Sequence, residues 1–310
     1  MLHSASKAFF HLLARIDALK TFASRYGMRE PASFGRRFIA GETTDEAIAA
    51  ARAVEARGFV QTLDYLGESV GSLAAADAAT REYLRVIDAV IASGIGRNLS
   101  LKLTQLGLDV DRASAIDNLR KIFDRAEGFF VRIDMESSAY TDVTLDIFEM
   151  LWNHGYRNMG VVLQSELLRS EQDARRIMAL GARIRLVKGA YREPKSVAYQ
   201  KKADVDAAYR RLLELLLSEG HYPAIATHDP AMIDAAKQFA AERRIAADRF
   251  EFQMLYGIRR DLQSALVAGG YRVRVYIPFG REWFPYFMRR LGERPANVGF
   301  VLRSLLSERN

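Results

Sequence analysis

Eight short runs rich in β-forming residues recur along this chain, and segments of helical length separate them. In these segments apolar residues recur every three or four positions, as at Leu84, Ile87 and Ile91, which is the pattern of a helix that buries one face. Several segments end at a glycine such as Gly94, as helix C-termini commonly do. The runs span residues 59–64, 98–103, 129–134, 159–164, 183–188, 224–227, 250–253 and 272–277. Eight strands that alternate with helices predict an α/β fold of the (βα)8 type.

A single barrel is favoured over two doubly wound domains. No G-x-G-x-x-G run opens a helix, and no break in composition divides the chain. We expect residues 1–42 to form an N-terminal helical arm and residues 43–310 to form a distorted (βα)8 barrel. Thr43 and Glu46 have the spacing of a capping box, which predicts that a helix begins there.

The composition limits where the protein works. Its 310 residues include no cysteine, so nothing ties the chain to an oxidising compartment, and we expect a cytoplasmic protein. No stretch of about 18 apolar residues runs without a charge, which leaves peripheral contact with the inner face of the membrane as the only membrane association. The net charge of +7 comes from scattered Lys and Arg residues, a pattern that does not favour nucleic-acid binding.

Polar residues stand where the predicted strands end, which is where (βα)8 enzymes place their active sites. Ser100 and Lys102 share one face of their strand, because side chains alternate with period two. Charges that point into a barrel have to be paired, so we predict a Lys102–Asp134 pair and a Glu251–Arg274 pair. The strand-end residues are Asp64, Lys102, Asp134, Glu136, Gln164, Lys188, Tyr191, Thr227, His228, Gln253 and Tyr276, with Glu68 shortly after the first.

The segment 271–300 carries the densest polar pattern. Pro278 and Gly280 predict the end of the eighth strand, and Pro285 suits the first turn of a following helix. On that helix Tyr286, Arg289, Arg290 and Glu293 share one face. Two guanidiniums and a phenol on an otherwise apolar helix predict an anion-binding surface over the barrel mouth.

Three other interpretations remain open at this point. Lys102 and Asp134 could be a purely structural pair, since ion-pair networks resemble sites. A metal site is disfavoured because no two histidines have ligand spacing and the basic groups would repel a cation. A Schiff-base aldolase that uses Lys188 is the stronger rival, although Lys188 is out of phase with the inward-facing Arg185.

Seven ordered stretches resemble one known family, the single-domain bacterial proline dehydrogenases. The resemblance extends from about residue 60 to residue 302. The stretches are SLKLTQLGL, RIDMES, VVLQS, RLVKGAYREP, ATHD, FEFQMLYG and YIPFGREWFPYFMRRLGERPAN. The resemblance implies non-covalently bound FAD and oxidation of L-proline to Δ1-pyrroline-5-carboxylate by hydride transfer from C5 to flavin N5, with electrons passed to a membrane quinone. Pyrroline-5-carboxylate dehydrogenase is a partner by pathway logic.

The same resemblance assigns residues to roles. Arg289, Arg290 and Lys102 would bind the proline carboxylate, while Tyr276, Tyr286 and Leu255 would enclose its ring. Asp134 would orient Lys102, and Glu68 would pair with Arg289 as a gate. The residues implied to hold the flavin are Met135, Gln164, Arg185, Val187, Lys188, Gly189, Ala190, Thr227, His228, Gln253 and Glu293. Asp134, Arg185, Lys102 and Tyr276 are the residues expected to support catalysis.

Overall fold

The structure is a computed structural model that describes the backbone of residues 34–293 and the side chains of residues 35–288. Its strands are β1 (Val60–Tyr65), β2 (Asn98–Leu101), β3 (Phe130–Ile133), β4 (Met159–Gln164), β5 (Arg183–Val187), β6 (Ala224–Ala226), β7 (Glu251–Leu255) and β8 (Val273–Phe279). The α-helices are α3 (Thr44–Glu55), α4 (Leu73–Ser93), α5 (Arg112–Arg125), α6 (Thr141–Asn153), α7 (Ser170–Ala179), α8 (Lys202–Glu219), α9 (Pro230–Glu242), α10 (Arg260–Ala268) and α11 (Trp283–Glu293). Short 3-10 helices are η1 (Phe34–Arg37), η2 (Thr104–Leu106), η3 (Ser138–Tyr140) and η4 (Ala247–Arg249).

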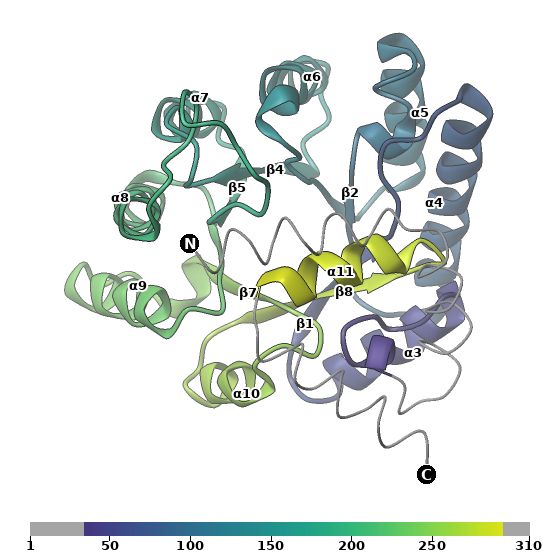
Figure 1. The fold of residues 1–310 in the computed structure, drawn as a ribbon. Coiled ribbons are helices and arrows are strands. Elements are labelled where there is room, and N and C mark those ends of the chain that lie inside the picture. The colour runs from purple at the N-terminus through teal and green to yellow at the C-terminus, as the bar shows by residue number, and fades with distance from the viewer. Residues whose placement is uncertain (1–33, 294–310) are drawn as a thin grey trace.

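The strands form a closed parallel barrel. Each strand pairs with the next in sequence order, and β8 pairs with β1 to close the ring. The helices surround this ring, and α11 lies across it (Figure 1). The predicted (βα)8 fold, with its last helix over the barrel mouth, is therefore confirmed. Most of the predicted arm, residues 1–33, lies outside the described residues.

Local sequence signals explain where the helices begin and end. The hydroxyl of Thr43 accepts a hydrogen bond from the Glu46 N–H, and Glu46 accepts one from the Thr43 N–H, which completes the predicted capping box of α3. Helix α4 ends at Gly94 with a φ of 74°, a left-handed conformation that glycine adopts at little cost. Of the periodic residues named for α4, Ile87 is buried in the hydrophobic core, and Leu84 and Ile91 pack against that core partly buried.

One prediction about β8 is wrong. Pro278 lies inside this strand and does not end it, because β8 continues to Phe279 beside β1. The ladder to β7 ends earlier, where Leu255 pairs with Tyr276, so no β7 partner needs the N–H group that proline lacks. The carbonyl of Pro278 instead accepts a hydrogen bond of 2.9 Å from the N–H of Ala40.

Helix α11 is held over the mouth by apolar contacts. Trp283, Phe287 and neighbouring residues form a buried cluster with Phe38 and Ile39, which precede α3. The same cluster includes Leu66, Leu255 and Ile258, which lie at or just beyond the C-terminal ends of β1 and β7. The helix therefore covers the end of the barrel where active sites are assembled.

The barrel interior contains charge as well as apolar side chains. Glu251 on β7 binds Arg274 on β8 through two hydrogen bonds, 2.7 Å from Nε to Oε1 and 2.9 Å from Nη2 to Oε2. Only 2% of Glu251 is exposed. Burial by itself would raise the pKa of Glu251, but Arg274, with smaller effects of Gln253 and Arg132, lowers the pKa below its usual value. The predicted Glu251–Arg274 pair is confirmed.

We predict that Arg274→Met lowers the free energy of unfolding by about 3–5 kcal/mol, because it leaves a buried carboxylate without its counter-charge. Urea denaturation measures this loss. The matched control is Arg272→Met, two residues earlier on an exposed position, where about 0.5 kcal/mol is expected. Equal losses in the two variants would contradict the assignment of a stabilising buried pair.

The same pair predicts a pH dependence. A carboxylate whose pKa is lowered in the folded protein contributes stability above its unfolded pKa, about 4.3 for Glu. That contribution is lost as the pH falls through the lowered pKa. The difference in unfolding free energy between the wild type and Arg274→Met should therefore shrink as the pH is lowered below about 4. A difference that stays constant between neutral and acidic pH would argue against the linkage.

Candidate active site

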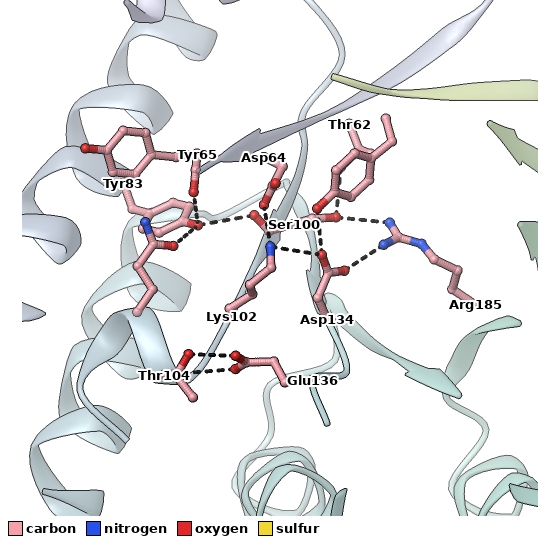
Figure 2. Close-up of polar contacts among 12 residues, drawn as sticks. Thr62, Asp64, Tyr65, Tyr83, Ser100, Lys102, Thr104, Asp134, Glu136 and Arg185 are labelled. Carbon is pink, nitrogen blue, oxygen red and sulfur yellow. Dashed lines mark hydrogen bonds and ion pairs between the residues drawn. The ribbon is translucent and has the colours of Figure 1, made fainter. Parts of the chain in front are cut away.

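Four charged side chains meet at the C-terminal end of the barrel. Asp64 lies one residue before the end of β1, Lys102 follows β2, Asp134 follows β3 and Arg185 lies in β5. Figure 2 shows the ammonium group of Lys102 between the two carboxylates, with Arg185 on the far side of Asp134. Two acids and two bases balance, so the network carries no net formal charge.

Asp134 is the most heavily engaged member of this network. Its Oδ1 accepts a hydrogen bond of 2.7 Å from Arg185 Nη1, and its Oδ2 accepts one of 2.7 Å from the hydroxyl of Tyr276. Arg185 also donates to Ser100 Oγ at 3.0 Å, and its guanidinium lies 5.3 Å from the centre of the Tyr276 ring. Asp134 thereby fixes a cation and a phenol at the barrel mouth.

Lys102 contacts both carboxylates. Its Nζ donates a hydrogen bond to Asp64 Oδ1 at 3.3 Å and lies 3.7 Å from Asp134 Oδ2. The predicted Lys102–Asp134 ion pair is present, but the hydrogen bond goes to Asp64. Sequence reasoning noted Asp64 at the end of its strand and assigned it no role. Its phase with Thr62, which contacts Ser100 inside the barrel, is the signal that could have identified it.

Burial and charge set the protonation of this network. Burial alone would lower the pKa of Lys102, but Asp64 and Asp134 raise it above its usual value, so the group is an ammonium at neutral pH. Burial and then Asp134 raise the pKa of Tyr276 well above its usual value. Tyr276 therefore remains a protonated donor to Asp134.

A cavity of about 890 Å³ opens beside the network, which is in the upper part of the size range of ligand pockets. Every described residue that was predicted to bind substrate or cofactor lines this cavity. These are Lys102, Asp134, Met135, Gln164, Arg185, Val187, Lys188, Gly189, Ala190, Thr227, His228, Gln253, Leu255, Tyr276 and Tyr286. Strand-end residues far apart in sequence are thus brought around one space.

Three residues that line this cavity carry buried polar atoms. Gln164 Oε1, Gln253 Oε1 and Arg185 Nε have no hydrogen-bond partner among the described residues. Since buried polar atoms are normally satisfied, these atoms are candidates to bind a polar ligand. Gly189, with a φ of 116°, also lines this wall, and a Cβ there would come within 2.0 Å of Glu166. Only glycine fits that position.

Lys188 forms ion pairs with two carboxylates that sequence reasoning missed. Its Nζ lies 2.5 Å from Asp206 on α8 and 2.6 Å from Asp229 at the start of α9. These carboxylates hold Lys188 as a hydrogen-bond donor, whereas a Schiff-base lysine must offer an unprotonated amine. Asp229 also accepts a hydrogen bond from the Ala231 N–H as the N-cap of α9. Nothing in strand parity could have placed Asp206, since it comes from a helix.

A second cavity of about 560 Å³ is lined by residues of the loop after β1 and of the first half of α4, among others. Glu68, the predicted gate residue, lines this cavity. Lys102 and Tyr286 line both cavities. The side chains of Arg289, Arg290 and Glu293 lie outside the described residues, although their backbone belongs to α11. The Glu68–Arg289 gate therefore stays a prediction.

Among the side chains that the structure describes, no cluster of three or more His, Asp or Glu could hold a metal ion. None of the described helices is long and apolar enough to cross a membrane.

A closed (βα)8 barrel with a charge-paired pocket at the C-terminal ends of its strands defines this chain as a barrel enzyme. A family model described as proline dehydrogenase matches residues 47–303. The chain belongs to the proline dehydrogenase family, and its activity is that of a proline-oxidising oxidoreductase.

Individual relatives agree with this membership. A proline dehydrogenase of Deinococcus radiodurans is 45% identical over 280 residues, which cover 88% of this chain and 90% of the relative. Proline dehydrogenase 1 of Bacillus subtilis subsp. natto is 41% identical over 301 residues, which cover 96% of this chain and 98% of the relative. The sequence resemblance to the single-domain enzymes is confirmed.

A solved structure of a longer relative shares the fold. Proline utilization A from Bdellovibrio bacteriovorus, inactivated by N-propargylglycine, superposes with a TM-score of 0.78 at 27% identity. The match covers 83% of this chain and 32% of that one. This chain thus corresponds to one part of the larger protein.

We predict that Asp134→Asn lowers the free energy of unfolding by about 3 kcal/mol, because two buried cations lose a counter-charge. Tyr276→Phe, which removes one hydrogen bond to the same carboxylate, should cost about 1 kcal/mol. Urea denaturation gives both values. Asp142→Asn is the control, since it breaks an ion pair with Arg169 in which Asp142 is 73% exposed, and it should change stability little. A larger loss in the control than in Asp134→Asn would refute the ranking.

Proposed function

We propose that the protein binds FAD non-covalently in the large cavity and oxidises L-proline to Δ1-pyrroline-5-carboxylate, the first step of proline breakdown towards glutamate. The observation that carries this proposal is the cavity whose walls contain all the described residues with a predicted substrate or cofactor role. The cavity is lined by members of the charge network and also by Lys188 and His228. This arrangement suits a small anionic amino acid beside a long cofactor.

The substrate would be bound mainly through its charge. Lys102 is an ammonium at the mouth, and Arg289 and Arg290 lie on the helix that covers it. Guanidiniums form directed, charge-assisted hydrogen bonds with carboxylates. Leu255 and Tyr276 are register partners on β7 and β8, so together they offer an apolar wall and an aromatic wall to the proline ring. Fixing the carboxylate and the ring at once holds C5 in one orientation.

The cavity walls fit a flavin. The unpartnered oxygens of Gln164 and Gln253 and the Nε of Arg185 offer acceptors and a donor to a polar ring edge. Gly189 allows close approach of the backbone, and Lys188 offers a cation to a pyrophosphate, with Asp206 and Asp229 limiting its net charge. When bound, FAD would supply the two-electron acceptor, with N5 receiving the hydride from proline C5.

The remaining steps concern the electrons and the product. A membrane quinone is the electron acceptor we propose, reached by a cytoplasmic enzyme through peripheral membrane contact. The positive net charge of +7 would assist contact with an anionic surface. Pyrroline-5-carboxylate dehydrogenase would consume the product. The Lys188 aldolase alternative has no support from the family to which the chain belongs.

We predict that the purified protein shows a visible flavin absorption band that bleaches when L-proline is added without oxygen. FAD released by denaturation, without covalently attached flavin on the chain, would identify a non-covalent cofactor. D-proline at the same concentration is the control and should bleach the band more slowly. A colourless protein would overturn the proposal. Borohydride trapping of a carbonyl substrate on Lys188 would then support the aldolase alternative.

We predict that Arg289→Met or Arg290→Met raises the KM for L-proline by more than about tenfold, because each removes a charge-assisted bond to the substrate carboxylate. Steady-state kinetics of the flavin-loaded enzyme measures the change. Arg272→Met, at the opposite end of β8, is the matched control and should leave KM unaltered. Normal KM values in both α11 variants would reject the carboxylate assignment.

A further inference from the structure

Asp64 is a fully buried carboxylate near the C-terminal end of β1. Its Oδ1 accepts the 3.3 Å hydrogen bond from Lys102, while Oδ2 has no hydrogen-bond partner among the described residues. Asp134 is differently occupied, because Arg185 and Tyr276 already donate to its two oxygens at 2.7 Å. The carboxylate that holds the Lys102 ammonium by a hydrogen bond is therefore Asp64.

We propose that Asp64 is the positioning residue for Lys102: it anchors the ammonium group at the barrel mouth in the place where the substrate carboxylate is bound. The proposal deepens the proposed function, since it rests on Lys102 binding that carboxylate. Asp64 itself does not touch the substrate. Its role is to hold one end of a flexible side chain, which has three rotatable donors on a four-carbon stem.

A comparison with Glu136 separates this role from a structural one. Glu136 is buried near Lys102 and binds the chain itself, accepting hydrogen bonds from the N–H of Thr104 at 3.2 Å and its hydroxyl at 2.7 Å. It thereby fixes the turn after β2. The hydrogen bond that Asp64 accepts comes from the Lys102 side chain instead. Figure 2 shows both arrangements side by side.

The charge balance explains why a second carboxylate is needed. Without Asp64, the ion-pair partner left to Lys102 would be Asp134, whose Oδ2 lies 3.7 Å from Nζ and which Arg185 already binds. Burial raises the pKa of Asp64, and Lys102 partly offsets that effect. Asp64 in turn raises the pKa of Lys102, so each member of the pair favours the charged form of the other. Removing the Asp64 charge should allow Lys102 to turn towards Asp134 and away from the substrate.

The test is a double-mutant cycle on the flavin-loaded enzyme with L-proline. We expect Asp64→Asn to raise KM about tenfold while kcat changes by less than about threefold, because the loss concerns one charged hydrogen bond that positions a binding group. Lys102→Met should raise KM at least as much. The double variant should resemble Lys102→Met alone, because Asp64 acts through Lys102.

The outcomes are distinguishable. A normal KM in Asp64→Asn, or effects of the two substitutions that multiply in the double variant, would overturn the positioning role. A normal KM in Lys102→Met would instead reject the proposed function on which it rests. Asp173→Asn is the matched control, since it neutralises a buried carboxylate paired with Arg169 on α7, and it should lower the melting temperature without changing KM. Asp64→Ser, measured in the same way, replaces Asp64→Asn if that variant does not fold.

Discussion

A charged side chain inside a closed barrel needs its counter-charge or its hydrogen-bond partners inside the same barrel. Much of this structure follows from that constraint. Water cannot neutralise the interior groups, and an isolated buried charge costs several kcal/mol. The chain therefore pairs several of its interior charges, at two levels, whereas the buried guanidinium of Arg132 on β3 donates to the backbone carbonyls of Val161 and Arg183. Glu251 and Arg274 pair between β7 and β8, and the network around Lys102 and Asp134 ties β1, β2, β3 and β5 at the mouth. The charges that a catalytic pocket needs are thus part of what holds the strands in register.

The sequence was informative wherever burial on one face of a strand or helix imposes a regular spacing of apolar residues. Outward-facing strand positions such as Val131 and Ile133 pack against helices and must be apolar, so the polar residues between them have to point inward. The alternation of β-rich runs with helical segments predicted the eight strands and the barrel, and the parity argument predicted both ion pairs. The strand ends moved by one or two residues, because an end is fixed by the neighbouring strand and not by the residue itself. Pro278 is the clearest case, since the end of β7 removes the need for its N–H.

What the sequence could not decide is which of several permitted neighbours a side chain chooses. Lys102 follows β2, which lies between β1 and β3, and period-two parity allows a carboxylate on either side. The ion pair to β3 was predicted, while the hydrogen bond to Asp64 on β1 was not, because its choice depends on Arg185 already occupying Asp134. Strand parity could not predict the contact of Asp206 with Lys188, because the position of Asp206 depends on how α8 packs against β5. Roles that rest on Arg289, Arg290 and Glu293 remain predictions.

The position of α11 links the pocket to the beginning of the described chain. Its apolar face packs on Phe38 and Ile39, and the indole N–H of Trp283 donates to Glu42 at 3.0 Å. Residues 38–42 therefore support the helix that carries Tyr286 and the two arginines, although they belong to the segment assigned to the N-terminal arm. Because Tyr286 lines both cavities, a shift of this support would alter both at once. The geometry of the pocket beside α11 thus depends on packing between segments about 240 residues apart, a distance over which no local sequence pattern carries information.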